Sequence, residues 1–144
     1  MEFIDISDLR KKAESGNVAA QSILGICYLE GIDVKTDYAQ AYHYLSLAAK
    51  RGTSRAQFNL GRMLANGLGV PRDPLRARSL YESSAAKGEF LAQIELGRIF
   101  SRGIEVPRDQ QAARKWYALA AEQEGRVEDC PELFEAKAYI SEVR

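Results

Sequence analysis

The sequence repeats itself with a period of 36 residues. Alanine, glutamine, leucine and glycine recur at the same register in three copies: Ala20, Gln21, Leu24 and Gly25; Ala56, Gln57, Leu60 and Gly61; Ala92, Gln93, Leu96 and Gly97. Self-similarity at this length predicts a solenoid of stacked helical hairpins. Arrays of this kind bind other molecules far more often than they catalyse reactions, so the period predicts a class of function without naming a partner.

The period divides the chain into three full units and two flanking half units, which we expect to form one repeat domain over residues 1–144. The expected segments are an N-terminal capping helix in 1–16, repeats in 17–52, 53–88 and 89–125, and a C-terminal capping helix in 126–144. Near Gly125 the register slips by eight residues, because Phe134 matches Phe90 at an offset of 44 instead of 36. A half unit at each end would cover the apolar side of the neighbouring hairpin.

Each unit is expected to contain a first helix, called helix A, and a second helix, called helix B. In the first unit, helix A should run from about Val18 to Glu30, because its apolar residues recur at helical spacing. Glycine inside this helix predicts a close approach of another helix, and a later glycine should end it in the left-handed conformation. The residues in question are Gly25, Gly61 and Gly97 inside helix A, Gly31, Gly67 and Gly103 at its end, and Asp37, Asp73 and Asp109 as expected N-caps of helix B.

Composition excludes some classes of function. The formal net charge is zero and the pI is near 6.6, which argues against a nucleic-acid binder or a protein bound to an anionic membrane. The N-terminal residues contain no apolar run typical of a signal peptide or a membrane span, so we expect a cytoplasmic protein if Met1 is the natural start. Cys27 and Cys130 occupy unrelated places in the repeat, which agrees with a reducing compartment.

No residue set predicts catalysis, a metal site or a cofactor. The only histidine, His43, has Ser79 and Lys115 as its equivalents and should be exposed on helix B. Cys27 aligns with Met63 and Ile99, as expected of a core residue. Histidine, cysteine and carboxylates do not cluster at metal-ligand spacing, and the period accounts for nearly all the glycines, which leaves no phosphate-binding loop.

The repeated unit resembles the Sel-one-like repeat (SLR), a relative of the tetratricopeptide repeat with a longer loop. The resemblance rests on Ala-x-x-x-Leu-Gly-x-x-Tyr, then Gly-x-x-Val-x-x-Asp, then Ala with an aromatic pair and Ala-Ala-x-x-Gly, and it covers residues 17–125 in three copies. It implies an all-α, right-handed α-α superhelical solenoid whose members act as adaptors, scaffolds or inhibitory partners, many of them bacterial. A branch with β-lactamase activity has paired cysteines in every repeat, and this chain lacks such pairs at the matching places.

The side of helix A that varies between copies is the candidate binding surface. In tetratricopeptide-like folds this side lines a concave groove, and stacking of the units would bring Arg62 near Arg98 and Phe58 near Ile94. We therefore predict a groove with an apolar floor and arginine flanks, formed by Arg55, Phe58, Arg62, Leu91, Ile94, Arg98 and Arg102. The residues at the same positions of the first repeat are small, apolar or acidic. The alternative is that these arginines are solvated surface whose stems cover neighbouring side chains.

The sequence thus favours a non-enzymatic adaptor or scaffold that binds an acidic or amphipathic segment of another protein and is monomeric alone. One alternative is a bacterial immunity-type inhibitor that binds and neutralises a cognate toxin or effector. A second alternative is a β-lactamase-like SLR enzyme, which would require a reacting group that the sequence does not show. No cofactor, metal, nucleic acid or membrane partner is expected.

Overall fold

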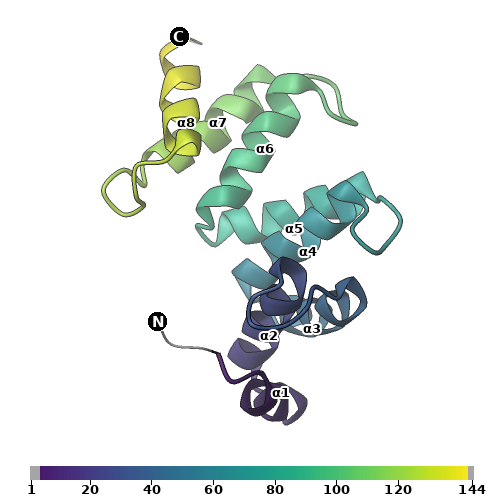
Figure 1. Ribbon diagram of the computed structural model, residues 1–144. Helices are drawn as coiled ribbons and strands as arrows, with labels where there is room; N and C mark the ends of the chain where they lie inside the picture. The colour runs from purple at the N-terminus through teal and green to yellow at the C-terminus, as the bar shows by residue number, and fades with distance from the viewer. Residues whose placement is uncertain (1–3, 143–144) are drawn as a thin grey trace. The chain divides into compact units, whose positions relative to one another are not determined.

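The computed structural model describes residues 4–142 of the chain. These residues form eight α-helices: α1 (Ile6–Glu14), α2 (Val18–Glu30), α3 (Tyr38–Lys50), α4 (Ser54–Asn66), α5 (Pro74–Ala86), α6 (Phe90–Arg102), α7 (Gln110–Ala121) and α8 (Pro131–Glu142). Helix A of the three repeats is α2, α4 and α6, and helix B is α3, α5 and α7 (Figure 1). The predicted all-α array of helical hairpins, with a single helix at each end, is confirmed.

The chain divides into two compact units, Met1–Leu80 and Tyr81–Arg144, with the boundary inside α5. In the first unit, α1 packs on α2, α2 on α3, and α3 on α4, and α2 also contacts α4. In the second unit, α6 packs on α7, α7 packs on α8, and α6 also contacts α8. The single repeat domain expected over residues 1–144 therefore stays a prediction.

The ends of the helices follow from particular residues of the repeat. Gly31, Gly67 and Gly103 end the three copies of helix A with φ of 70°, 66° and 70°, a left-handed conformation that glycine adopts without steric cost. Helix B begins after an aspartate: the Oδ1 atoms of Asp37, Asp73 and Asp109 accept hydrogen bonds from the backbone N–H groups of Gln40, Arg76 and Ala112 at 3.1, 3.1 and 3.0 Å. Both predictions are confirmed.

Glycine inside helix A allows helix B to pack closely against it. A Cβ atom at Gly25 would lie 2.6 Å from Cγ of Leu45, and one at Gly97 would lie 2.8 Å from the ring of Tyr117. Leu45 and Tyr117 occupy the same position of helix B in the first and third repeats. The predicted close approach is therefore confirmed in both units, and it explains why glycine stands in a helix interior, where it costs about 1 kcal/mol relative to alanine.

A buried glutamine connects each helix A to the helix that precedes it. The side-chain Nε2 of Gln21, Gln57 and Gln93 donates to the carbonyl oxygens of Ala13, Ala49 and Ala85 at 3.1, 3.3 and 3.2 Å. These carbonyls lie in the last turn of α1, α3 and α5, where each also accepts from the backbone N–H of the glycine three residues on, Gly16, Gly52 and Gly88. The glutamine of the repeat therefore adds a second donor to a buried carbonyl at each junction.

The two terminal helices are single helices without a hairpin partner. Asp5 caps α1 by accepting from the N–H of Asp8 at 3.1 Å, and Ala13 is buried against the first repeat. At the other end, residues 122–130 form a long connection, and α8 begins at Pro131, three residues before Phe134. The expected insertion near residues 125–132 thus lengthens this connection and adds a turn to the helix. Within residues 4–142, no helix combines the length and apolar character needed to cross a membrane.

Candidate protein-interaction surface

The positions of helix A that vary between repeats follow one burial pattern, and we call these positions the variable row. The row consists of Ala19, Ser22, Ile26 and Glu30 on α2, of Arg55, Phe58, Arg62 and Asn66 on α4, and of Leu91, Ile94, Arg98 and Arg102 on α6. In all three helices the first and fourth positions are exposed, the third is half-buried and the second is buried. The invariant positions between them, alanine, glutamine, leucine and glycine, are all buried. The variation therefore reaches solvent at the first, third and fourth positions of the row and is buried at the second.

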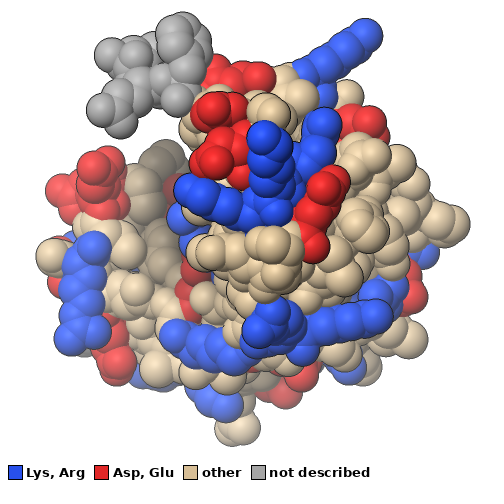
Figure 2. Space-filling view, turned by 90° about the horizontal axis from the view of Figure 1, so that it is seen from below, with Lys and Arg blue, Asp and Glu red and all other residues tan. Residues whose placement is uncertain are grey.

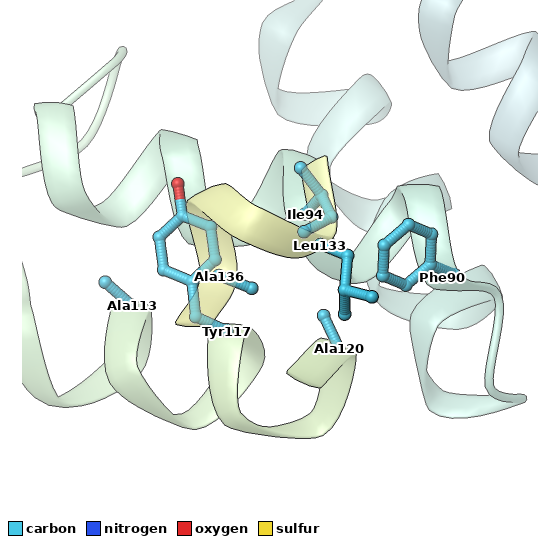
Figure 3. Close-up of a cluster of buried hydrophobic side chains, with 7 residues drawn as sticks. All are labelled: Phe90, Ile94, Ala113, Tyr117, Ala120, Leu133 and Ala136. Atoms are coloured by element: carbon cyan, nitrogen blue, oxygen red, sulfur yellow. The ribbon is translucent and has the colours of Figure 1, made fainter. Parts of the chain in front are cut away.

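The second position of the row differs from the sequence expectation. The sequence predicts Phe58 and Ile94 on the floor of a groove, whereas Phe58 is only 8% exposed and Ile94 is fully buried. Ile94 lies in a cluster with Phe90 and Tyr117, and Leu133 of α8 packs into the same cluster (Figure 3). For Ile94 the physical reason is that α8 packs over it, with Leu133 in the same cluster. These two side chains therefore support the surface from below.

Arg62 joins α4 to α2 within the first unit. Its Nη1 lies 2.7 Å from Oε1 of Glu30 and 2.9 Å from Oδ1 of Asn59. About a third of the Arg62 side chain and two fifths of the Glu30 side chain are exposed, 35% and 42% respectively. Ion pairs with this exposure contribute up to about 1 kcal/mol. Arg62 is therefore held in place by its own chain and is not a purely solvated side chain.

Arg98 makes the corresponding link in the second unit, from α6 to α8. Its Nε and Nη2 donate to the carboxylate of Glu135, with the shortest distance 2.6 Å between Nη2 and Oε2. A second carboxylate, that of Glu95, lies 2.8 Å from Nη1. The hydroxyl of Tyr117 also donates to Glu135 Oε1, at 2.9 Å. A two-pronged arginine contact of this kind fixes the carboxylate in direction as well as distance.

The pKa values in this network are shifted in opposite directions. Burial alone would raise the pKa of Glu135, but the hydrogen bonds from Arg98 and Tyr117 outweigh it and hold the pKa below its ordinary value. Burial, followed by the hydrogen bond to Glu135, raises the pKa of Tyr117. At neutral pH the network therefore contains an ionised carboxylate and a neutral phenol that donates to it.

Three further residues of the predicted site lie at the surface. Arg55 on α4 is exposed, Leu91 on α6 is 39% exposed, and the Arg102 side chain is 62% exposed with its Nη2 3.9 Å from Glu135. These residues reach solvent with weaker ties to the chain than Arg98 has. They are the members of the predicted site that a partner can contact directly.

The structure assigns some roles that the sequence expectations omitted. Glu30 pairs with Arg62, and Glu135, which accepts from Tyr117, pairs with Arg98. None of these three partners belongs to the predicted binding set. One sequence signal exists, because the offset of 44 places Glu135 at the register of Leu91, on the helix that follows Arg98. Charge of both signs is also interspersed over the face shown in Figure 2, in keeping with the zero net charge.

The residues considered for chemistry lie in different surroundings. His43 is exposed on α3 with its ring against that of Tyr44, and Cys27 is buried in α2, where burial raises the pKa of its thiol. The second cysteine, Cys130, is half-buried before α8. Among residues 4–142 no three His, Cys, Asp or Glu side chains are grouped so that they could hold a metal ion.

Comparison with known proteins agrees with this geometry. A family model described as the Sel1 repeat matches residues 18–53, 54–89 and 91–124. Since these segments span well over half of the sequence, the chain belongs to the Sel1 repeat family. A comparison with curated proteins gives no match.

Two solved structures are similar over nearly the whole chain. A Sel1 repeat protein from Oxalobacter formigenes has 36% sequence identity and a TM-score of 0.77, with 96% of this chain and 98% of that chain covered. The protein c5321, a protective antigen present in uropathogenic Escherichia coli strains that displays an SLR fold, has 31% identity and a TM-score of 0.79. That alignment covers 96% of this chain but only 32% of the E. coli protein, so this chain corresponds to about a third of its length.

Proposed function

We propose that this Sel1 repeat protein is a non-catalytic adaptor that binds an acidic or amphipathic segment of another protein on the variable row, which α4 displays in the first unit and α6 displays in the second. Sel1 repeats are in general protein-interaction modules. The observation that carries the proposal is the burial pattern of helix A, in which the varying first and fourth positions are exposed and the repeated positions between them are buried. Selection of a partner requires side chains that differ and reach solvent, and this row supplies them.

The charge of the exposed row favours an acidic partner. Arg55 is exposed in the first unit, and Arg102 is exposed in the second, where its 3.9 Å approach to Glu135 is longer than the 2.7 Å between Arg62 and Glu30. Arginine is common among residues that dominate binding energy, because its planar fork can pair with carboxylates and its stem packs on apolar groups. A partner with carboxylates in reach of these side chains would gain both contacts.

The amphipathic part of the proposal rests on Leu91. This side chain is 39% exposed on α6, and it lies seven residues before Arg98 and eleven before Arg102, on the same side of the helix. An apolar side chain of the partner over Leu91, with an acidic side chain toward Arg102, would match the row. Either a helix or an extended peptide satisfies that arrangement.

Support for a non-catalytic role comes from the places of the reactive side chains. A cysteine and a histidine act together only when they lie within hydrogen-bond reach. Here Cys27 is buried in α2 and His43 is exposed on α3. The polar network around Arg98 contains an arginine, a neutral phenol and a carboxylate with a lowered pKa, which suits structural anchoring better than proton transfer at neutral pH.

The test is capture of partners from cells of the source organism with three baits. The baits are the wild type, the charge-reversed Arg55→Glu/Arg102→Glu variant, and the matched control Lys50→Glu/Lys115→Glu. The control reverses two exposed charges on α3 and α7 and so makes the same change in net charge. We expect a protein that the wild type and the control retain and that the row variant retains at least ten-fold less.

A partner retained equally by all three folded baits would refute binding through the variable row. Circular dichroism establishes that each bait is folded before capture. The identity of the partner then separates an adaptor from an inhibitor: an inhibitor suppresses the partner's own activity when the two are mixed, and an adaptor leaves that activity intact.

A further inference from the structure

The second unit contains a helix-binding surface that is already occupied. Helix α8 docks on α6 and α7 through Leu133 and Ala136, both fully buried. Figure 3 shows Leu133 pointing toward Phe90 and Ala120, with Ala136 beside Tyr117. Burial of a leucine side chain stabilises such a contact. The surface that receives α8 is thus an apolar cluster made by α6 and α7.

The same surface also binds one carboxylate group through two hydrogen-bond donors. Arg98 and Tyr117, from α6 and α7, both donate to Glu135 of α8, two residues after Leu133 and one before Ala136. The combination therefore recognises a defined pattern on one helix: leucine, any residue, glutamate, alanine. Without that glutamate, the half-buried guanidinium of Arg98 would keep only its contact with Glu95.

Among the described residues, α8 has one docked face and one open face. The docked face lies on α6 and α7, whereas the outward face exposes Phe134, at 59%, and Ala138. The long connection of residues 122–130 contains Gly125 at φ +86°, and an exposed ion pair between Lys137 and Glu124 closes it. The docked face and this connection are therefore the contacts that a competing helix has to replace.

We propose that α8 is an internal occupant of a helix-binding site and that the natural partner is an amphipathic helix with the same leucine-x-glutamate-alanine pattern, which displaces α8 and binds in its place. This inference rests on the proposed function: it adds a class of partner and a second contact surface next to the exposed positions of α6, which α8 covers until it is displaced. Because only nine residues connect α7 to α8, the cis helix competes at an effective concentration of at least about the millimolar level of short linkers. A partner in trans therefore binds with an apparent affinity reduced by the fraction of molecules in which the site is open.

The first experiment uses a fluorescent peptide with the sequence of residues 126–144 as the probe. Its binding is measured by anisotropy to the full wild-type chain, to the weakened-dock variant Leu133→Ala/Glu135→Gln, and to the control Phe134→Ala/Glu142→Gln. The control makes the same chemical changes on exposed positions of α8. We expect the weakened-dock variant to bind the peptide at least ten-fold more tightly than the wild type and the control, and Arg98→Ala added to it to reverse the gain.

Equal or undetectable peptide binding by the wild type and a folded weakened-dock variant would overturn the proposal. A second measurement avoids any dependence on that variant. A protease site is inserted between Gly125 and Arg126, the chain is cut, and exchange of the freed segment for labelled peptide is followed together with circular dichroism. Exchange with retained helicity supports the proposal, whereas absence of exchange, or unfolding of the second unit when the segment leaves, overturns it. Neither result changes the outcome of partner capture, so failure here is distinct from failure of the proposed function.

Discussion

Arg98 Nη2 and Glu135 Oε2 lie 2.6 Å apart and join α6 to α8 in the second unit. Arg62 and Glu30 form the equivalent link between α4 and α2 in the first unit, at 2.7 Å. In both units a member of the variable row is therefore anchored by a glutamate of a neighbouring helix A. Anchoring reduces the rotamer entropy that a long arginine side chain would lose on binding a partner, so these pairs leave the surface preorganised.

Docking of α8 should depend on pH through Glu135. Because the folded-state pKa of this carboxyl is lowered, its contribution to stability is present above the ordinary value near 4.5 and is lost as pH falls through the lower folded value. We expect the protection factors of the α8 amides, which are corrected for the intrinsic pH dependence of exchange, to stay constant between about pH 7 and 5 and to fall below about 4.5. The Glu135→Gln variant should show faster exchange in α8 already at neutral pH and a weaker acid dependence. An identical acid profile in both proteins would contradict this role.

The hydroxyl of Tyr117 should give the second unit an alkaline limit. Because the folded-state pKa of Tyr117 is raised above the ordinary value of 10.0, its contribution is complete below that value and is lost as pH rises beyond it. Melting temperatures between pH 8 and 11 should fall more steeply for the wild type than for Tyr117→Phe. The exposed Tyr38→Phe change is the control and should follow the wild-type profile. A profile of Tyr117→Phe that matches the wild type would contradict the prediction.

Alanine at Gly97 should destabilise the protein in spite of its helix propensity. Propensity alone would favour Gly97→Ala by about 1 kcal/mol, but the new Cβ would lie 2.8 Å from the ring of Tyr117. Overpacking of this kind costs roughly 1–3 kcal/mol. Urea unfolding should therefore show a net loss of stability.

Ser141→Ala is the matched control for Gly97→Ala, because Ser141 stands at the glycine register on α8 and is exposed. It should change the free energy of unfolding by less than about 0.5 kcal/mol. A Gly97→Ala protein more stable than the wild type would show that the close approach does not require glycine.

Removing the glutamine that joins α4 to α3 should lower stability. Gln57→Met keeps the side-chain length and removes the side-chain donor of the Ala49 carbonyl, which keeps its hydrogen bond from the Gly52 N–H. Loss of one such hydrogen bond costs about 0.5–1.5 kcal/mol. Thermal unfolding should show this loss, and Gln40→Met, at an exposed position of α3, should change stability little. Equal melting temperatures for the two variants would indicate that the junction hydrogen bond is not stabilising.

Much of the fold could be predicted from helix caps and glycines, because the 36-residue repeat places each of them in three copies. Examples are Asp109 before a helix, Gly103 after a helix and Gly97 inside a helix. Each acts through backbone geometry or through a contact between the two helices of a hairpin. Because the residue recurs in three copies, the three copies support the same interpretation. The exposure of His43 and the burial of Cys27 were predictable in the same way, from the residues at equivalent positions.

The binding surface was less predictable because it depends on contacts between helices of different repeats. A helical spacing places Arg55 and Phe58 on one side of α4, but their difference in exposure depends on the neighbouring helix, which the spacing does not specify. The pairing of Arg98 with Glu135 was hidden by the slip of register before α8. The predicted binding by the seven residues together stays a prediction, with two of them now placed beneath the surface.

The most direct test of binding through the variable row is amide hydrogen exchange of the chain with and without its captured partner. The account predicts exchange at least ten-fold slower in α4 or α6, the helices that display Arg55 and Arg102, with α3 and α7 unchanged. Slower exchange confined to α3 and α7, with α4 and α6 unaffected, would contradict it.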